Sequence, residues 1–179
     1  ERNLLPLILR VLVLSMIIFS ISDFTITLNG YESDMDFVFA IDSSSSMLNP
    51  DVEPSRLEAA KLSAMNLVQK LPTETMMAVM TFSGDTQMQC ELSSKKEKLE
   101  GCVSNITYGK KGGTAIGDAI FLASTELKDT NNKRGIILIT DGKNNAGIEL
   151  NQSLDSAIEK NITIFTVGIG TKSNATEFD

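Results

Sequence analysis

The sequence contains no histidine, no tryptophan and only two cysteines among its 179 residues. Without histidine, the chain cannot form a Ser-His-Asp triad, a Cys-His pair or a His-ligated metal site. Two cysteines are too few for a Cys₄ zinc site. Several large classes of enzymes and zinc proteins are therefore excluded before any motif is considered.

Positive charge is also scarce, since 16 Lys and Arg stand against 23 Asp and Glu and give a net charge of −7. Binding to nucleic-acid phosphates needs clustered cations, and the two tyrosines and eight phenylalanines form no aromatic and basic groove. We therefore expect no nucleic-acid partner. The hydrophobic content of 42 % argues against a disordered chain, and the length suits one α/β domain.

Hydrophobic residues are concentrated near the N-terminus, where residues 4–21 (LLPLILRVLVLSMIIFSI) carry a single charge, that of Arg10. This run has roughly the 20 residues that a helix needs to cross a bilayer. Arg10 lies near its start, where a long side chain can reach the lipid head groups. The core of a signal peptide and a buried N-terminal helix are the alternatives.

Charges on either side of this run predict its orientation. Arginines lie before or near its start and acidic residues follow it, so the N-terminus is expected in the cytoplasm. We predict a transmembrane anchor over residues 1–23, a linker over 24–35 and an extracytoplasmic domain over 36–179. The protein is then expected in the cell membrane, with a single span in this sequence.

From residue 36 onward, short apolar runs alternate with segments of helical periodicity. Uninterrupted apolar runs are typical of strands buried on both faces of a mostly parallel sheet; they are residues 37–41, 76–82, 136–139 and 162–167. Helical apolar faces are expected over residues 57–71, 99–106, 116–127 and 154–158. We predict an α/β fold with a doubly wound, Rossmann-like sheet.

Residues 86–92 follow a different pattern, because apolar and polar side chains alternate strictly along them. This alternation, after the turn residues 83–85, predicts an antiparallel edge strand with Met88, Cys90 and Leu92 on one side. Cys90 then faces the apolar side of the next helix, which carries Cys102. Export would permit a disulfide between them, and two buried free thiols are the alternative.

Polar residues follow the strands that end at residues 41 and 139, at the edge where sheets of this kind bind ligands. Taken singly, the serines after residue 42 form a solvated turn, Asp141-Gly142 is a turn, and Thr114 is a helix cap. Taken together, they supply two carboxylates and three hydroxyls, from Asp42, Ser44, Ser46, Thr114 and Asp141. This all-oxygen set suits Mg²⁺, with Mn²⁺ and Ca²⁺ as alternatives, and we expect it to keep waters and an open coordination position.

The pattern Asp42-x-Ser44-x-Ser46, with Thr114 and Asp141-Gly142 later in the chain, resembles the metal-ion-dependent adhesion site (MIDAS) of von Willebrand factor A (vWA) domains. The resemblance covers residues 36–171. It implies that both serines bind the metal directly, that the threonine binds directly or through water, and that the two aspartates bind mostly through waters. It also implies that an acidic residue of a protein partner completes the coordination. Ser45 departs from the pattern, because the family commonly has glycine there.

Two longer segments, GGTAIGDAI (residues 112–120) and ITDGKNNAG (residues 139–147), narrow this resemblance. With the preceding hydrophobic run, they are similar to the membrane-anchored Bat-type vWA proteins (BatA/BatB, aerotolerance-associated). That group is linked to MoxR-type ATPases and to envelope processes, which implies other subunits of a membrane complex as partners. A full vWA domain would also have a last strand and helix, which we expect to be missing from residues 36–179.

Two other functions are weighed against metal-dependent protein binding. The first is a structural or assembly subunit whose site holds no metal and whose helix faces dock a partner. The second is a phosphoester hydrolase that uses Asp42, but the phosphatase motif with this order needs a second aspartate where Ser44 stands. The glycine-rich segments at residues 109–114 and 168–173 match neither a phosphate loop nor a dinucleotide fingerprint. We therefore expect no enzymatic activity.

Overall fold

The computed structural model describes residues 4, 6, 8–12, 35–127 and 132–171. The chain divides into two compact units, Glu1–Tyr31 and Glu32–Asp179. Most of the predicted anchor (residues 13–21 of the apolar run) and of the linker lies outside the described residues. In the part of the chain that the structure describes, no helix is both long and apolar enough to cross a membrane. The anchor therefore stays a prediction.

A five-stranded sheet in the order β3-β2-β1-β4-β5 forms the centre of the second unit. Its strands are β1 (Met35–Asp42), β2 (Met77–Phe82), β3 (Thr86–Ser93), β4 (Lys133–Thr140) and β5 (Ile162–Gly168). β1 pairs in parallel with β2 and β4, β5 pairs in parallel with β4, and β3 is antiparallel to β2. The predicted α/β fold, with a mostly parallel sheet and one antiparallel edge strand, is confirmed.

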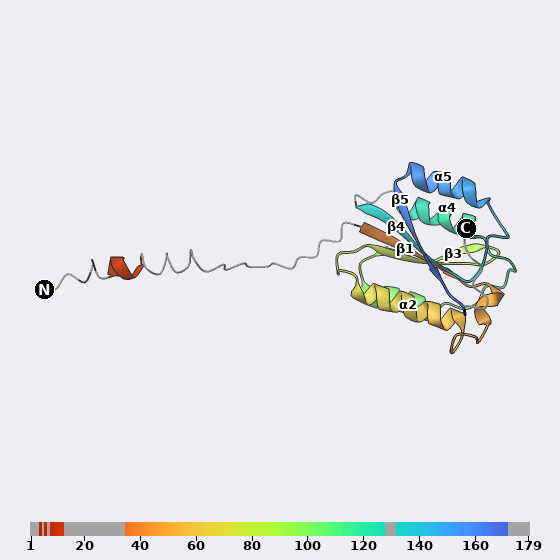
Figure 1. Ribbon diagram of the computed structural model, residues 1–179, viewed down its shortest axis with the longest axis horizontal. Helices are drawn as coiled ribbons and strands as arrows, with labels where there is room; N and C mark the ends of the chain where they lie inside the picture. Colours follow the sequence, from red (N-terminus) through yellow and green to blue (C-terminus); the bar gives the residue numbers. More distant parts are fainter. Residues whose placement is uncertain (1–3, 5, 7, 13–34, 128–131, 172–179) are drawn as a thin grey trace. The chain divides into compact units, whose positions relative to one another are not determined.

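Helices cover both faces of this sheet, as Figure 1 shows. One face packs against α2 (Arg56–Lys70) and α3 (Lys96–Ser104), and the other against α4 (Ile116–Glu126) and α5 (Leu150–Glu159). Successive residues of β1 serve the two faces alternately, with Phe39 and Ile41 in the α2/α3 core and Val38 and Ala40 in the α4/α5 core. The continuous apolar run in the sequence follows from this burial on both sides.

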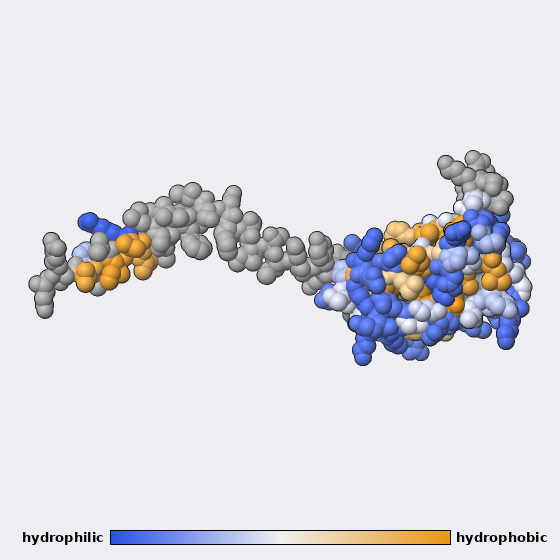
Figure 2. Space-filling model, turned by 90° about the horizontal axis from the view of Figure 1, so that it is seen from below, coloured by the Kyte–Doolittle hydropathy of each residue, from blue (hydrophilic) through white to orange (hydrophobic). Residues whose placement is uncertain are grey.

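The outer surface of the α2 side is mostly hydrophilic, with smaller apolar areas between the charged side chains (Figure 2). α2 itself begins with Ser55 as its N-cap, whose hydroxyl accepts a hydrogen bond from the backbone N–H of Glu58 at 3.2 Å. This Ser-x-x-Glu arrangement fixes the first turn of the helix. It thereby fixes the position of Arg56, the first helical residue.

One local expectation and two of the alternative interpretations differ from the structure. Residues 162–167 were expected to be buried on both faces, yet β5 is an edge strand, and the side chain of Phe165 is 44 % exposed. Ser45–Leu48 forms a short 3-10 helix rather than a solvated turn, because Met47 is fully buried in the α2/α3 core. Thr114 does not cap α4, whose N-cap is Ala115.

A disulfide joins Cys90 of β3 to Cys102 of α3, with 6.1 Å between their Cα atoms. The predicted alternation of covered and exposed residues along β3 is confirmed. The prediction that Met88, Cys90 and Leu92 share one side is wrong, because Cys90 packs in the α2/α3 core while Met88 and Leu92 pack against the α4/α5 core. The pairing of β2 with β3 shifts register on both sides of the Val79–Cys90 pair, and each shift reverses the side to which the following residues point. Cys90 alone therefore faces α3.

Candidate metal centre

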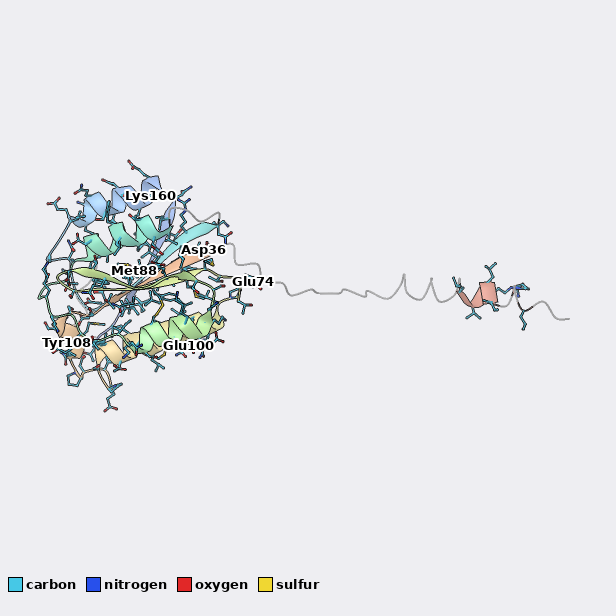
Figure 3. The ribbon with its side chains drawn as sticks, turned by 180° about the vertical axis from the view of Figure 1, so that it is seen from behind. Asp36, Glu74, Met88, Glu100, Tyr108 and Lys160 are labelled. Carbon is cyan, nitrogen blue, oxygen red and sulfur yellow. A yellow bond between two sulfur atoms is a disulfide. The ribbon has the colours of Figure 1, made fainter. Side chains whose placement is uncertain are left out.

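The predicted site residues lie at the end of β1 and in three loops beside the carboxyl ends of the parallel strands. Asp42 is the last residue of β1, Asp141 directly follows β4, and Thr114 precedes α4. The loop before α4 is tied to this edge, since the N–H of Gly109 donates to the carbonyl of Ser43 and that of Ala115 to the carbonyl of Ser83, both at 2.7 Å. In Figure 3, Tyr108 of the same loop lies at the end of the domain opposite Asp36.

Asp42 is fully buried, and both of its carboxylate oxygens accept hydrogen bonds. The backbone N–H of Ser44 donates to Oδ1 at 2.8 Å, and the hydroxyl of Thr140 donates to Oδ2 at 2.6 Å. Burial raises the pKa of Asp42, the hydrogen bonds from Ser44 and Thr140 oppose this shift, and the charge of Asp141 adds to it. The two hydrogen bonds fix the carboxylate of Asp42 in one orientation at the base of the loop.

The hydroxyls of Ser44 and Ser46 lie 3.0 Å apart, and the hydroxyl of Ser46 donates to Oδ1 of Asp141 at 2.8 Å. Two oxygens on adjacent octahedral positions around Mg²⁺ are about 2.8–3.0 Å apart, because each lies about 2.0–2.1 Å from the ion. The serine pair therefore has the spacing of neighbouring Mg²⁺ ligands. Ser46 is exposed while Ser44 is buried, so the pair opens toward solvent on one side.

Thr114 is buried and lies beside the Asp141-Gly142 turn. A Cβ atom added to Gly142 would lie 3.8 Å from the hydroxyl oxygen of Thr114. The backbone of Thr114 is held by Asn145, which accepts from its N–H at 2.7 Å and donates to its carbonyl at 3.1 Å. The five predicted residues thus come together, four of them linked by hydrogen bonds and Thr114 next to the turn.

The donor set is poor in carboxylates. Among the described residues, no group of three or more His, Cys, Asp or Glu side chains could hold a metal. The set instead offers neutral hydroxyl oxygens and two aspartates, which fits a hard divalent cation that keeps bound water. Metal binding itself stays a prediction.

Sequence reasoning missed Arg56, which forms ion pairs with two aspartates. Its Nη1 lies 2.6 Å from Oδ2 of Asp141, and its Nη2 lies 2.7 Å from Oδ2 of Asp51. The hydrogen bonds from Arg56 lower the pKa of Asp51 to about 2. A cation in the first turn of a helix is disfavoured by the helix dipole, and this was the one sequence signal that could have drawn attention to Arg56.

Three further positioning residues were also missed. Thr140 links the two strand ends, because its hydroxyl donates to Asp42 and accepts from the N–H of Gly142 at 3.1 Å. Asn145 holds Thr114, as described above, and Asn144 accepts from the N–H of Gly117 in α4 at 3.2 Å. Asparagines after an Asp-Gly turn are common turn formers, so their type alone did not indicate this role.

The family model described as von Willebrand factor type A domain matches residues 37–143. The chain belongs to the von Willebrand factor A family. The matched residues include Asp42, the two serines, Thr114 and Asp141, so the family match spans the whole candidate metal centre.

This vWA domain is similar to solved structures of Bat-type proteins. BatB from Bacteroides thetaiotaomicron superposes with a TM-score of 0.71 at 34 % identity, covering 78 % of this chain and 68 % of that one. An aerotolerance-related membrane protein from Bacteroides fragilis superposes with a TM-score of 0.70 at 32 % identity, covering 76 % and 68 %. The predicted resemblance to Bat-type vWA proteins is confirmed.

Among curated proteins, YfbK of Escherichia coli is 30 % identical over 142 residues, which is 75 % of this chain and 24 % of YfbK. A UPF0353 protein of Mycobacterium bovis is 25 % identical over 186 residues, which is 92 % of this chain and 55 % of that protein. The chain thus spans about a quarter of the first relative and about half of the second.

Proposed function

We propose that this vWA domain binds a divalent cation, Mg²⁺ before Mn²⁺ or Ca²⁺, through Asp42, Ser44, Ser46, Thr114 and Asp141, and that the cation binds an acidic residue of a protein partner. The observation that carries the proposal is the 3.0 Å separation of the two serine hydroxyls, with Ser46 donating to Asp141. A hydroxyl that donates its proton to a carboxylate keeps its lone pairs for a metal.

The charge distribution favours an anionic ligand from outside the chain. When bound, the cation would supply a Lewis-acidic position for a carboxylate. Both oxygens of Asp42 are committed to Ser44 and Thr140, and those of Asp141 are committed to Ser46 and Arg56. Each of these four oxygens already accepts one hydrogen bond, so the two aspartates would bind the ion mostly through waters and leave its charge largely uncompensated.

A polar cavity beside the site supports an acidic partner. It has a volume of about 490 Å³ and lies between the β2–β3 hairpin and the loop after α3. Lys110 and Lys111, both exposed, line the cavity together with the exposed Tyr108, and Asp85 is the one carboxylate among the described residues that line it. The residues that flank the coordinating acid of a partner would meet this cavity.

We also propose that the domain is extracytoplasmic and anchored in the cell membrane through residues 4–21, where it works with other subunits of a membrane complex. Three observations support this placement. They are the apolar run with its asymmetric flanking charges, the Cys90–Cys102 disulfide, and the similarity to a membrane protein of Bacteroides fragilis. Disulfides persist in oxidising compartments and are rare in the cytosol.

We do not propose phosphoester hydrolysis. A nucleophilic Asp42 would need an accessible oxygen, whereas this side chain is 0 % exposed and holds two hydrogen bonds. The proposed function is therefore binding without catalysis.

Calorimetric titration of the 179-residue chain with Mg²⁺ and Mn²⁺, in a mild detergent, tests the proposal. The wild type should bind one ion, and Asp141→Ala should bind none. Asp155→Ala is the matched control, because Asp155 is an exposed aspartate on α5 and its loss should leave metal affinity unchanged. Unchanged metal binding by Asp141→Ala would refute the site. A glutamate-rich peptide should then bind in Mg²⁺ and not in EDTA.

A further inference from the structure

One guanidinium group joins the candidate metal centre to the loop before α2. Nη1 of Arg56 lies 2.6 Å from Asp141, and Nε and Nη2 each lie 2.7 Å from an oxygen of Asp51. The side chains of Arg56 and Asp141 are only 8 % and 1 % exposed. Solvent ions therefore screen this pair much less than a surface ion pair.

Arg56 is also held in place by its surroundings. Its backbone N–H donates to the carbonyl of Asn49 at 3.1 Å, and Asp51 accepts a further hydrogen bond from the hydroxyl of Thr171 at 3.3 Å. The planar guanidinium contacts the two oxygens of Asp51 with two parallel donors, which fixes its orientation. The positive charge thus has a fixed position against Asp141.

We propose that Arg56 is a built-in counter-charge for Asp141 that lowers the affinity of the metal site, an inference that rests on the proposed function. The guanidinium and a divalent cation are attracted by the same carboxylate and repel each other. Even at the dielectric constant of bulk water, about 80, a unit charge several ångströms from a divalent ion changes its binding by about tenfold. Metal binding then depends more strongly on the carboxylate that a partner contributes.

The same ion pair stabilises the domain when divalent cations are scarce. The side chain of Asp141 is buried, and a buried carboxylate without a paired cation strongly destabilises the folded domain. Arg56 provides that cation permanently. The domain therefore stays folded as metal is bound and released, at the cost of weaker binding.

Two charge-removing substitutions separate a counter-charge from a purely positional role. Arg56→Gln removes the positive charge and should bind Mn²⁺ about tenfold more tightly than the wild type. Asp51→Asn removes the second carboxylate but leaves the guanidinium on Asp141, so it should bind Mn²⁺ more weakly. Arg56→Lys keeps the charge and is the matched control, with an affinity within about threefold of the wild type.

Mn²⁺ affinity is measured by calorimetry on the 179-residue chain, and thermal unfolding is followed in EDTA and in saturating Mn²⁺. Arg56→Gln should unfold at a lower temperature than the wild type in EDTA and gain more from Mn²⁺, because tighter binding to the folded state gives greater stabilisation. If Arg56→Gln does not fold in EDTA, Mn²⁺ should restore the fold.

Weaker Mn²⁺ binding by both Arg56→Gln and Asp51→Asn would show that the cluster only positions Asp141, and would overturn this inference while leaving the metal site intact. An Arg56→Gln chain that Mn²⁺ cannot refold would overturn it as well. Failure of the wild type to bind Mn²⁺ would instead refute the proposed function on which the inference rests.

Discussion

The disulfide between Cys90 and Cys102 allows a quantitative prediction of stability. Replacing both residues by alanine opens a covalent loop whose ends are 12 residues apart in the sequence. The chain-entropy relation for a loop of this size gives a loss of about 3 kcal/mol in the free energy of unfolding at 25 °C. Cys90 is 4 % exposed, so its smaller replacement would add a packing loss to this entropic term.

Urea unfolding of the wild type and of the double alanine variant, followed by circular dichroism, measures this difference. With a slope of about 2 kcal/mol per molar urea, the predicted loss corresponds to a midpoint about 1.5 M lower. The wild type with and without a reducing agent is the matched control, because reduction opens the same loop without changing the sequence. The reduced wild type should approach the midpoint of the variant.

Equal midpoints for the oxidised wild type, the reduced wild type and the double variant would refute this reasoning. They would show that the link between β3 and α3 does not restrict the unfolded chain. The extracytoplasmic placement would then lose one of its three supports.

Three further predictions concern the loops around the candidate metal centre. Gly84→Ala should lower the free energy of unfolding by about 1–3 kcal/mol and weaken Mn²⁺ binding, because the new Cβ would collide with the carbonyl of Gly112 in the loop before Thr114. Urea unfolding and calorimetry measure the two effects. Gly112→Ala is the control, because its new Cβ would meet no atom within 4 Å. Asn145→Ala should lower the free energy of unfolding by about 1–2 kcal/mol and weaken Mn²⁺ binding, because it leaves the N–H of Thr114 without its acceptor. Asn151→Ala, at an exposed position, is the control and should change neither the stability nor the Mn²⁺ affinity. The third prediction concerns pH. The pKa of Asp51 falls from 3.8 to about 2 in the folded state, so its contribution to stability is complete above pH 4 and is lost as the pH falls toward 2. In urea unfolding at several pH values, the stability difference between the wild type and Asp51→Asn should therefore shrink over this range, and a constant difference would contradict the ion pair.

The sheet and the metal-centre residues could be predicted because they depend on short-range patterns. Continuous apolar runs such as residues 37–41 occur where strands are covered on both faces, and β1 is covered in this way. Parallel strands end at the same edge, so Asp42 and Asp141 had to lie near each other once their strands were assigned. The order of the helices followed from the same alternation.

Three other features of the fold and the site depend on contacts between distant parts of the chain, which no local sequence pattern predicts. Arg56 and Asp141 are 85 residues apart, and their pairing requires α2 to begin beside the end of β4. Nor could the sequence indicate the irregular β2–β3 pairing that places Cys90 on the opposite side of the sheet from Met88 and Leu92, since residues 86–92 follow the alternating pattern. β5 has the apolar composition of an interior strand, but it is the edge of the sheet. These three features depend on which residues and strands lie next to each other in the folded chain, and residue type alone does not predict that.

The most direct test of the proposed metal centre is a crystal structure of the protein grown with Mn²⁺, with the ion located by its anomalous scattering. We predict a peak that lies about 2.2 Å from the hydroxyl oxygens of both Ser44 and Ser46, with Thr114 and Asp141 beside it. Mn²⁺ bound elsewhere, or no peak between the two serines at a concentration that saturates the calorimetric titration, would contradict the account.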